Sequence, residues 1–236
     1  MAFAPALPHG SLTKVIDGIH VIRGTFRMGL GLRIGRTMTV VGGADGLTVI
    51  NSVRLTPEGE RELEQLGPVR HVIKLSDAHG IDDPYYVDRY KAKLWALEGA
   101  RLPVGLEATP LGPDTPLDGA VVLDYPGIAG GRECGLWLPA GGGTLVTCDA
   151  LQNHDGNEQF ASWFGKVMTP ILGFKGGVIV APMWRKIRKV SGESLRAALA
   201  PLGGHAFANL VTAHGPPVVG GADKIAREAI ERAASE

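Results

Sequence analysis

The sequence predicts an α+β fold in which two mixed β-sheets carry helices on their outer faces. Three observations support this prediction. Short apolar, strand-like runs make up much of the chain, helical segments follow them at irregular intervals, and many of the 34 glycines fall in clusters between apolar runs. This order excludes the steady βαβ alternation of a doubly wound sheet, and the helices exclude an all-β sandwich. With 236 residues, the chain is expected to form a single domain spanning residues 1–236.

The first half of the chain is predicted to be mostly strands. The expected strands are 13–23 (a hairpin that turns at Asp17-Gly18), 36–41, 47–53 and 71–75. A helix is expected at 56–66, because Thr56 is a good N-cap, Pro57 suits the first helical position and Gly67-Pro68 ends the pattern. A second helix is expected at 84–97. The glycine-broken stretch 26–34 gives no clear prediction.

The second half is predicted to alternate short strands with fewer helices. The expected strands are 120–125, 135–138, 144–148, 178–181 and 207–212, and the expected helices are 194–201 and 222–234. Residues 152–163 are polar with scattered aromatic side chains, which favours an active-site loop or a short helix. The basic run 185–189 is assigned to a solvated surface.

The composition excludes several classes of partner and compartment. Lys plus Arg and Asp plus Glu both number 24, so the formal net charge is zero and nothing favours nucleic acid or a membrane surface. Only two cysteines are present, Cys134 and Cys148, which favours a reducing compartment such as the cytoplasm. We find no apolar run of membrane-spanning length and no secretory signal at the N-terminus. The expected partner is a small-molecule substrate.

Candidate metal ligands follow three of the predicted strands. They are Asp77, His79, Asp82 and Asp83 after the first, Asp149 after the second, and His214 after the third. If these three strand ends converge, their carboxylates and imidazoles form a cluster able to hold a divalent metal, which would activate water and polarise a substrate oxygen. A structural interpretation also stands: Asp82 or Asp83 caps the helix that Pro84 begins, and His79 is an ordinary loop residue.

These strand ends resemble those of the metallo-β-lactamase fold superfamily. Residues 144–151, TLVTCDAL, resemble the strand that ends in the family's metal-bridging Asp, and residues 210–217, LVTAHGPP, resemble the strand that ends in its last metal-binding His. The order of helix, Gly-Pro, strand, acidic/His loop and helix at 58–97 matches the place of the family's first metal motif. The resemblance covers most of the chain. It implies a four-layer αββα sandwich with the site in a shallow cleft at the sheet edges.

The chain departs from the family's first motif, His-x-His-x-Asp-His. The matching residues read DAHGID at 77–82, so only His79 is retained and Ile81 stands where the family has Asp. The stretch 125–135, where the family has another His, contains none. By this resemblance one metal site keeps Asp77, His79 and Asp149. The other keeps Asp82, Asp149 and His214.

This predicted ligand set is rich in oxygen, which favours Mn, Fe or Mg over a tight zinc pair. The expected cofactor is a divalent metal (Zn, Fe or Mn), as one ion or none. Three residues are candidates to replace missing ligands: Asp83, Glu133 and Cys134. If no metal binds, the neighbouring carboxylates are expected to need protonation, a cationic partner such as Lys74 or Arg132, or plentiful water.

Two functional interpretations therefore stand almost level. In the first, the protein is a metal-dependent hydrolase of an ester, lactone, thioester or phosphoester, with Asp149 and Asp82 as the catalytic residues. In the second, it keeps the fold without catalysis and serves as a binding or interaction module. Retained His79, Asp149 and His214 favour the first interpretation, and Ile81 favours the second. A redox protein with a non-haem iron pair is a third, weaker alternative.

Overall fold

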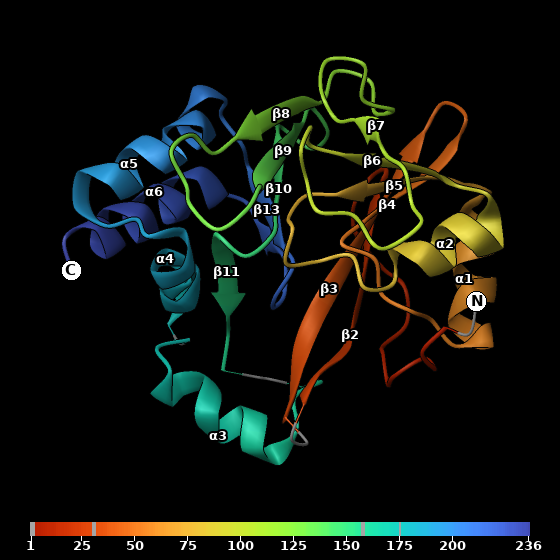
Figure 1. Ribbon diagram of the computed structural model, residues 1–236, viewed down its shortest axis with the longest axis horizontal. Helices are drawn as coiled ribbons and strands as arrows, with labels where there is room; N and C mark the ends of the chain where they lie inside the picture. Colours follow the sequence, from red (N-terminus) through yellow and green to blue (C-terminus); the bar gives the residue numbers. More distant parts are fainter. Residues whose placement is uncertain (1–2, 30–31, 157–158, 175) are drawn as a thin grey trace.

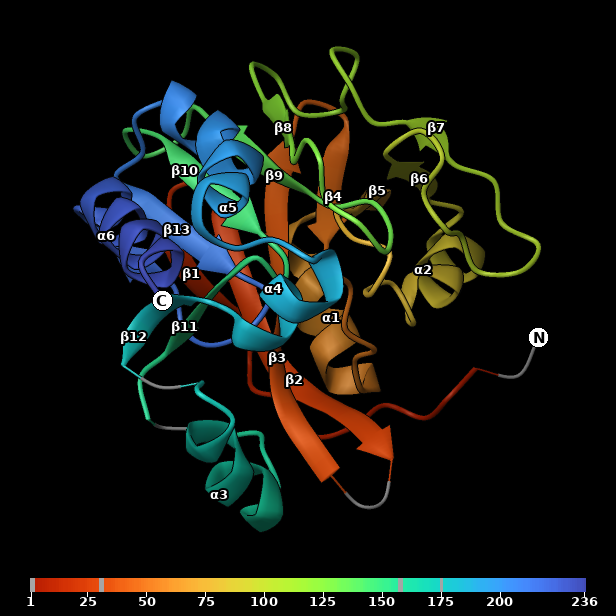
Figure 2. The same cartoon turned by 60° about the vertical axis from the view of Figure 1, so that its left-hand side comes forward.

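Two β-sheets face each other at the centre of the molecule, and helices cover the outer face of each (Figures 1 and 2). This computed structural model describes residues 3–29, 32–156, 159–174 and 176–236. The prediction of an α+β fold with two mixed sheets between helices is confirmed. Among the described residues, no helix is long and apolar enough to cross a membrane.

The first sheet contains seven strands in the order in which they occur along the chain. They are β1 (Thr13–Ile16), β2 (Ile19–Gly29), β3 (Leu32–Gly43), β4 (Gly46–Ile50), β5 (Val69–Lys74), β6 (Lys93–Ala96) and β7 (Thr109–Pro110). The first four strands pair antiparallel through hairpins, and β4 to β7 pair parallel. The expected hairpin at Asp17-Gly18 is present, with Gly18 at φ 78°.

The second sheet has five strands in the order β14-β13-β10-β9-β8. They are β8 (Val121–Asp124), β9 (Cys134–Leu138), β10 (Thr144–Thr147), β13 (Asn209–Thr212) and β14 (Val218–Val219). Strand β10 pairs parallel with β13, in a register that places Thr147 opposite Thr212. A separate antiparallel pair consists of β11 (Leu151–His154) and β12 (Gly177–Val180). The parallel pairing of β10 and β13 brings their carboxyl ends to one edge of the sheet.

The helices lie on the two outer faces and at one end of the sheets (Figure 2). They are α1 (Pro57–Leu66), α2 (Asp83–Tyr90), α3 (Trp163–Ile171), α4 (Pro182–Arg188), α5 (Gly192–Leu199), the 3-10 helix η1 (Ala200–Gly204) and α6 (Ala222–Ala234). Helix α1 begins as predicted, because the Thr56 hydroxyl accepts a hydrogen bond from Gly59 N at 3.3 Å. Helix α6 has the predicted bounds.

Three clusters of buried apolar side chains hold the layers together. One lies between the two sheets and includes Ile73, Val146 and Val211. A second packs α1 and α2 on the first sheet, and a third packs α4, α5 and α6 on the second sheet. Since each sheet is covered on both faces, most strand residues in these layers are apolar, as the continuous apolar runs indicated.

The prediction of a single helix over 84–97 is wrong. Helix α2 ends at Tyr90, where Lys91 takes a left-handed conformation with φ 54°, and residues 93–96 form β6. Leu94, Trp95 and Ala96 are buried in this strand. Parallel pairing with β5 therefore buries these side chains and satisfies their backbone groups together, which outweighs the local helical pattern.

The secondary structure of two further stretches was not predicted correctly from the sequence. Of the expected loop or short helix at 152–163, residues 152–154 belong to β11 and Trp163 begins α3, which was not predicted; residues 157–158 lie outside the described part of the chain. The stretch 26–34 continues the hairpin of β2 and β3, with residues 30–31 outside the described part. Most of the basic run 185–189 belongs to α4.

Candidate metal centre

Three strand ends converge on one cluster of side chains, which we call the ligand cluster: His79, Asp149 and His214. His79 follows β5, Asp149 follows β10 and His214 follows β13. The Oδ1 atom of Asp149 lies 3.1 Å from Nε2 of His79 and 3.2 Å from Nε2 of His214. The two Nε2 atoms are 3.3 Å apart. The structure therefore brings together one residue from each predicted strand end.

The tautomer of His214 leaves a lone pair at the centre of the cluster. Its Nδ1 lies 2.8 Å from the carbonyl oxygen of Gly35, and because a carbonyl oxygen only accepts, Nδ1 carries the hydrogen. In the neutral ring, Nε2 is then unprotonated and faces the carboxylate of Asp149. A lone pair beside an anion is unfavourable unless a proton or a cation lies between them.

The glycine after His214 fixes the backbone at this point. Gly215 has φ 90°, and a Cβ atom there would lie 1.5 Å from the carbonyl oxygen of Asn153. The amide of Asn153 in turn donates to the carbonyl oxygen of His214 at 3.1 Å. Any side chain at position 215 would push β11 away from the cluster. The His-Gly pair is therefore a structural requirement for placing the imidazole.

The spacing of the three atoms fits one divalent ion. Nitrogen or oxygen ligands about 2.0–2.2 Å from a tetrahedral ion lie about 3.3–3.6 Å from one another, and the observed separations of 3.1, 3.2 and 3.3 Å lie at or just below the lower end of this range. Two imidazoles and one carboxylate are a donor set that holds Zn²⁺ or Fe²⁺ with open positions for water or substrate. The residues present thus fit a single divalent metal.

Cys148 is a possible fourth ligand that the sequence interpretation did not include. Its sulfur and one ligand atom each from His79 and Asp149 all lie within 4.8 Å of one another. Burial, with the charges of Asp149 and Glu133, raises the pKa of the Cys148 thiol well above its usual value. The thiol is therefore protonated without a metal. The only feature of the sequence that pointed to Cys148 as a ligand is its position directly before Asp149.

Glu133 supports the cluster from below rather than joining it. Its Oε1 accepts from the backbone amides of Asp149 at 3.0 Å and Ala150 at 2.8 Å. Its Oε2 accepts from Trp184 Nε1 at 2.9 Å and Arg188 Nη2 at 3.1 Å. Burial and the charge of Asp149 raise the pKa of Glu133, and Arg188 opposes the rise. Of the three candidates to replace a missing ligand, Glu133 therefore has both oxygens occupied by donors of the protein.

The electrostatics of Asp149 favour a bound cation. Burial alone would raise the pKa of Asp149, but the neighbouring imidazoles of His79 and His214 hold it well below its usual range. The carboxylate thus stays ionised in a buried position because imidazoles surround it. The same arrangement stabilises a metal ion when the imidazoles are neutral.

Asp82 lies outside the ligand cluster, which corrects its assignment as a metal ligand and catalytic residue. Its Oδ2 forms an ion pair with Arg36 and accepts from the backbone amide of Arg54 at 2.8 Å. The side chains of Arg36 and Asp82 are only 10% and 9% exposed. A buried carboxylate needs such partners, and Asp82 finds them in the protein. Arg36, which the sequence interpretation missed, neutralises it.

Asp77 also lies outside the ligand cluster, although it lines the same cavity. Its Oδ1 accepts from the backbone amide of Arg101 at 2.8 Å, and its Oδ2 accepts from that of Arg132 at 2.9 Å. The carboxylate thereby joins two loops. Asp77 and Asp82 are therefore not among the metal ligands, and the remaining donors are two nitrogens and one carboxylate oxygen. This set is richer in nitrogen than the predicted one, so the predicted preference for oxygen-binding metals no longer applies.

The remaining candidates of the sequence take structural positions. Asp83 Oδ1 accepts from the Ser52 hydroxyl at 2.6 Å, and burial raises its pKa. The Lys74 ammonium donates to the carbonyl oxygen of His79. Arg132 pairs with Asp124 on the surface, and Cys134 is buried between the sheets. Neither Lys74 nor Arg132 fills the centre of the ligand cluster.

A cavity of about 510 Å³ opens above the cluster, and its walls are mostly apolar. The apolar lining comes from the β2–β3 hairpin, the loop after β5, α3 with the residues after it, and α4: Phe26, Met28, Leu32, Ile34, Ile81, Met168, Leu172, Phe174, Met183, Trp184 and Ile187. His79, Asp149, His214, Gln152 and Arg36 supply polar groups. Tyr85 and Tyr86 of α2 pack in the core and are not part of this cavity.

Comparison with known proteins supports the fold. No protein-family model matches the sequence, and no curated protein matches it. Among solved structures, the chain is similar to the DIM-1 metallo-β-lactamase exposed to ceftazidime, with a TM-score of 0.61 and 15% identity over 97% of this chain and 98% of that one. It is also similar to the metallo-β-lactamase FIM-1 from Pseudomonas aeruginosa in its mono-zinc form, with a TM-score of 0.60 and 12% identity over 98% of both chains.

A metallo-β-lactamase from Erythrobacter litoralis gives a TM-score of 0.53 and 17% identity over 95% of this chain and 90% of that one. These likenesses extend over nearly the whole length of each chain at low identity. The chain therefore has the metallo-β-lactamase fold, in a strongly divergent sequence.

Proposed function

We propose that this protein is a metal-dependent hydrolase with a single divalent ion held by His79, Asp149 and His214. The observation that carries the proposal is the convergence of an anionic oxygen and two imidazole nitrogens within 3.3 Å of one another. Such a cluster is unfavourable without a proton or a cation at its centre. A divalent ion there supplies Lewis-acid chemistry, polarising a carbonyl or phosphoryl oxygen and making water acidic enough to attack near neutral pH.

The donor set favours Zn²⁺ or Fe²⁺ for this site. Two imidazoles and a carboxylate suit these ions, while Mg²⁺ prefers an all-oxygen set. One ion is favoured over two, because the carboxylates that the resemblance assigned to further ligands are bound by protein donors: Asp77 by two backbone amides and Asp82 by Arg36. Imidazole ligands must be neutral to bind a metal, so binding weakens as the pH falls.

The residues of the chain position the ligands and shape the substrate site. The carbonyl oxygen of Gly35 fixes the tautomer of His214, and Glu133 fixes the backbone of Asp149. The cavity is large enough for a small-molecule substrate. Its apolar walls exclude water beside the cluster. An ester, lactone, thioester or phosphoester offers the electrophilic centre that this chemistry needs, with its polar group at the cluster and its apolar part against the walls.

The alternative of a non-catalytic binding module rests on Ile81. By the resemblance this residue stands where the family has Asp, and its side chain lines the cavity without any polar atom. A protein that uses the cavity only to bind a ligand would keep its apolar walls and need no metal.

The test is a hydrolase screen on the purified chain reconstituted with Zn²⁺ or Fe²⁺. Substrates are chromogenic esters, lactones, thioesters and phosphoesters. We expect turnover of at least one class that falls at least about a hundredfold in His79→Ala and in Asp149→Ala. Asp77→Asn is the matched control, since Asp77 also lines the cavity but lies outside the ligand cluster. Metal-loaded protein without turnover of any class would favour the binding module.

A further inference from the structure

Helix α3 exposes an apolar face that nothing in the described chain covers. Four side chains spaced along one side of the helix are exposed: Trp163 by 79%, Phe164 by 50%, Val167 by 42% and Ile171 by 69%. We call this set the α3 outer face. An apolar patch of this kind, with two aromatic side chains, marks an interaction surface rather than ordinary surface variation.

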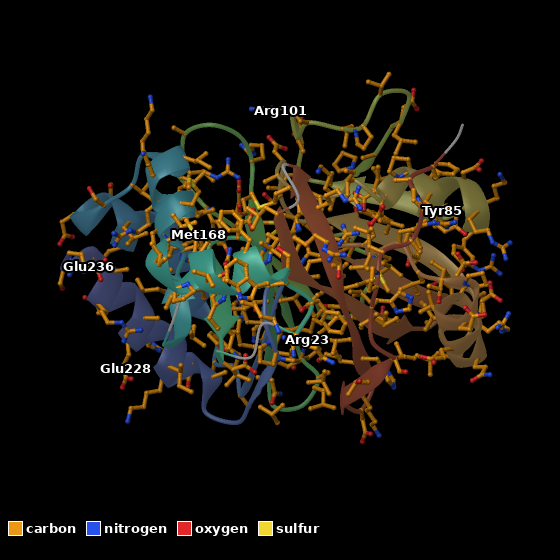
Figure 3. The ribbon with its side chains drawn as sticks, turned by 90° about the horizontal axis from the view of Figure 1, so that it is seen from below. Arg23, Tyr85, Arg101, Met168, Glu228 and Glu236 are labelled. Carbon is orange, nitrogen blue, oxygen red and sulfur yellow. The ribbon has the colours of Figure 1, made fainter. Side chains whose placement is uncertain are left out.

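The opposite side of the same helix belongs to the cavity. Gly165, Met168, Thr169 and Leu172 line it, whereas no residue of the α3 outer face does. Figure 3, which views the molecule from below, shows α3 with Met168 in front, beside the β2–β3 hairpin. The residues of the α3 outer face therefore belong neither to the buried core nor to the cavity wall. Helix α3 lies between the cavity and any partner that contacts this face.

Two residues, Ser162 and Gly165, fix the position of α3 on the β2–β3 hairpin. Backbone and side-chain hydrogen bonds join Ser162 to Arg33: Ser162 N donates to Arg33 O at 3.0 Å, and Arg33 N donates to the Ser162 hydroxyl at 3.2 Å. A Cβ atom on Gly165 would lie 2.4 Å from Arg33 O. Close packing of α3 on β3 therefore requires glycine at this position, and it holds the end of the hairpin beside the exposed aromatic side chains.

Three segments that contribute to the cavity wall beside α3 carry charge of one sign. The segments 26–34, 163–172 and 182–189 contain no Asp or Glu. Their exposed cations are Arg27, Arg33, Lys166, Lys186 and Lys189. Arg27 and Arg33 are direct cross-strand partners, and within the described ranges neither has an ion pair. Two like charges in this position repel each other unless an anionic partner lies nearby. The zero net charge of the whole chain conceals this local excess.

From these observations we propose that the α3 outer face, together with Arg27, Met28 and Arg33 of β2 and β3, docks on an anionic lipid surface. Aromatic and aliphatic side chains would enter the interface, and the surrounding Arg and Lys side chains would face lipid phosphates. The exposed side chains of Met28, Met183 and Ile187 line the mouth of the cavity. The proposed docking does not depend on the proposed hydrolase activity.

The test is a vesicle-binding experiment on the full chain. Sedimentation is measured with vesicles of phosphatidylcholine alone and of phosphatidylcholine mixed in equal parts with phosphatidylglycerol. We expect binding to the mixed vesicles that weakens with added salt, because exposed charges are screened. Trp163 is the one highly exposed tryptophan, as Trp95 and Trp184 are buried and Trp137 is half-buried. Binding should therefore shift the tryptophan emission to shorter wavelength.

Trp163→Ser with Phe164→Ser should lower the vesicle partition coefficient by about tenfold or more, given the apolar area that these side chains would lose from the interface. Lys166→Gln should cause a smaller loss, confined to the anionic vesicles. Val104→Ser is the matched control. Val104 is 95% exposed on the loop between β6 and β7, which lies away from α3 in both ribbon views, and its substitution should leave the partition unchanged.

Three outcomes would overturn the proposal. The first is the absence of binding to either kind of vesicle. The second is equal loss in the Val104 control, which would show non-specific adhesion. The third is a dimer in analytical ultracentrifugation that Trp163→Ser dissociates, with no vesicle binding, which would assign the α3 outer face to a second copy of the chain. Metal content of each variant is measured in parallel and should stay unchanged, so that a folding defect is recognised.

Discussion

Two groups of acidic and imidazole side chains lie close to each other in this protein, and the structure uses them in opposite ways. In the ligand cluster, the Asp149 carboxylate faces two imidazole nitrogens. The carboxylates Asp77, Asp82 and Asp83, which we together call the carboxylate loop, instead accept from donors that the protein supplies: backbone amides, the Arg36 guanidinium and the Ser52 hydroxyl. Residue types alone do not distinguish the two groups, because both contain buried carboxylates at strand ends.

The difference lies in what each carboxylate oxygen meets. A carboxylate whose oxygens accept from protein donors is a structural element, and a metal would have to displace those donors. A carboxylate that faces lone pairs is incomplete until a proton or a cation joins it. On this comparison, substitutions in the carboxylate loop should change stability and spare the metal, whereas those around the ligand cluster should do the reverse.

The largest stability effect is expected from Asp82→Ala. The substitution leaves the Arg36 guanidinium buried without its counter-ion, which should lower the free energy of unfolding by about 3–5 kcal/mol. Urea unfolding measures the loss. Metal content should not change. If Asp82→Ala instead removes the metal while sparing stability, Asp82 is a ligand and the comparison fails. The double variant Arg36→Met/Asp82→Ala should regain part of the lost stability.

Glu133→Gln should affect the metal more than the fold. The amide keeps the shape of the side chain but weakens its acceptance from the Asp149 and Ala150 amides and from Arg188. Loss of such support typically lowers metal affinity about 10–100-fold. Competition with a chromophoric chelator measures the affinity. Unchanged affinity together with a large loss of stability would place Glu133 with the carboxylate loop.

Asp77→Asn should have a modest effect on stability. The amide can accept only one of the two backbone hydrogen bonds that Asp77 accepts, from Arg101 and Arg132. The expected loss is about 1 kcal/mol, measured by urea unfolding. Metal stoichiometry should stay at one ion per chain. A drop in stoichiometry would return Asp77 to the ligand set.

The smallest effect is expected from Asp83→Asn, and it depends on pH. Burial raises the pKa of Asp83, so the folded state holds a proton that the unfolded state has released, and stability falls as the pH rises from the ordinary value through the raised one. Asn is neutral at every pH and still accepts from Ser52. Unfolding at pH 5 and pH 8 should show the variant gaining on the wild type as the pH rises. A constant difference would contradict the burial argument.

The sequence predicted the layers of the fold better than the chemistry of the site. Apolar runs, glycine turns and the Thr56-Pro57 cap are local signals, so the strands of the first sheet and helices α1 and α6 were largely predicted. Strand β6 was missed because its burial depends on β5, which lies elsewhere in the chain. Helix α3 was missed because its apolar residues face solvent on one side and the cavity on the other.

For the site, the strand ends predicted which elements meet but not which carboxylates lack partners. Asp149 and His214 converge because the parallel strands β10 and β13 end at the same sheet edge, and His79 joins them from the end of β5 in the other sheet. Arg36 reaches Asp82 from a strand 46 residues away in the chain, and the amides that bind Asp77 belong to two other loops. Such long-range donors leave no pattern in the sequence. Only the assembled fold therefore separates the ligand cluster from the carboxylate loop.

The most direct test of this account is the metal content of the purified chain by inductively coupled plasma mass spectrometry. Wild type, Asp149→Ala/His214→Ala and Asp77→Asn are compared after reconstitution with Zn²⁺ or Fe²⁺. We predict close to one ion per chain in the wild type and in Asp77→Asn, and none in the double variant, with circular dichroism confirming that all three are folded. A wild type that stays free of metal, or a double variant that keeps its ion, would contradict the assignment of His79, Asp149 and His214 as a metal centre.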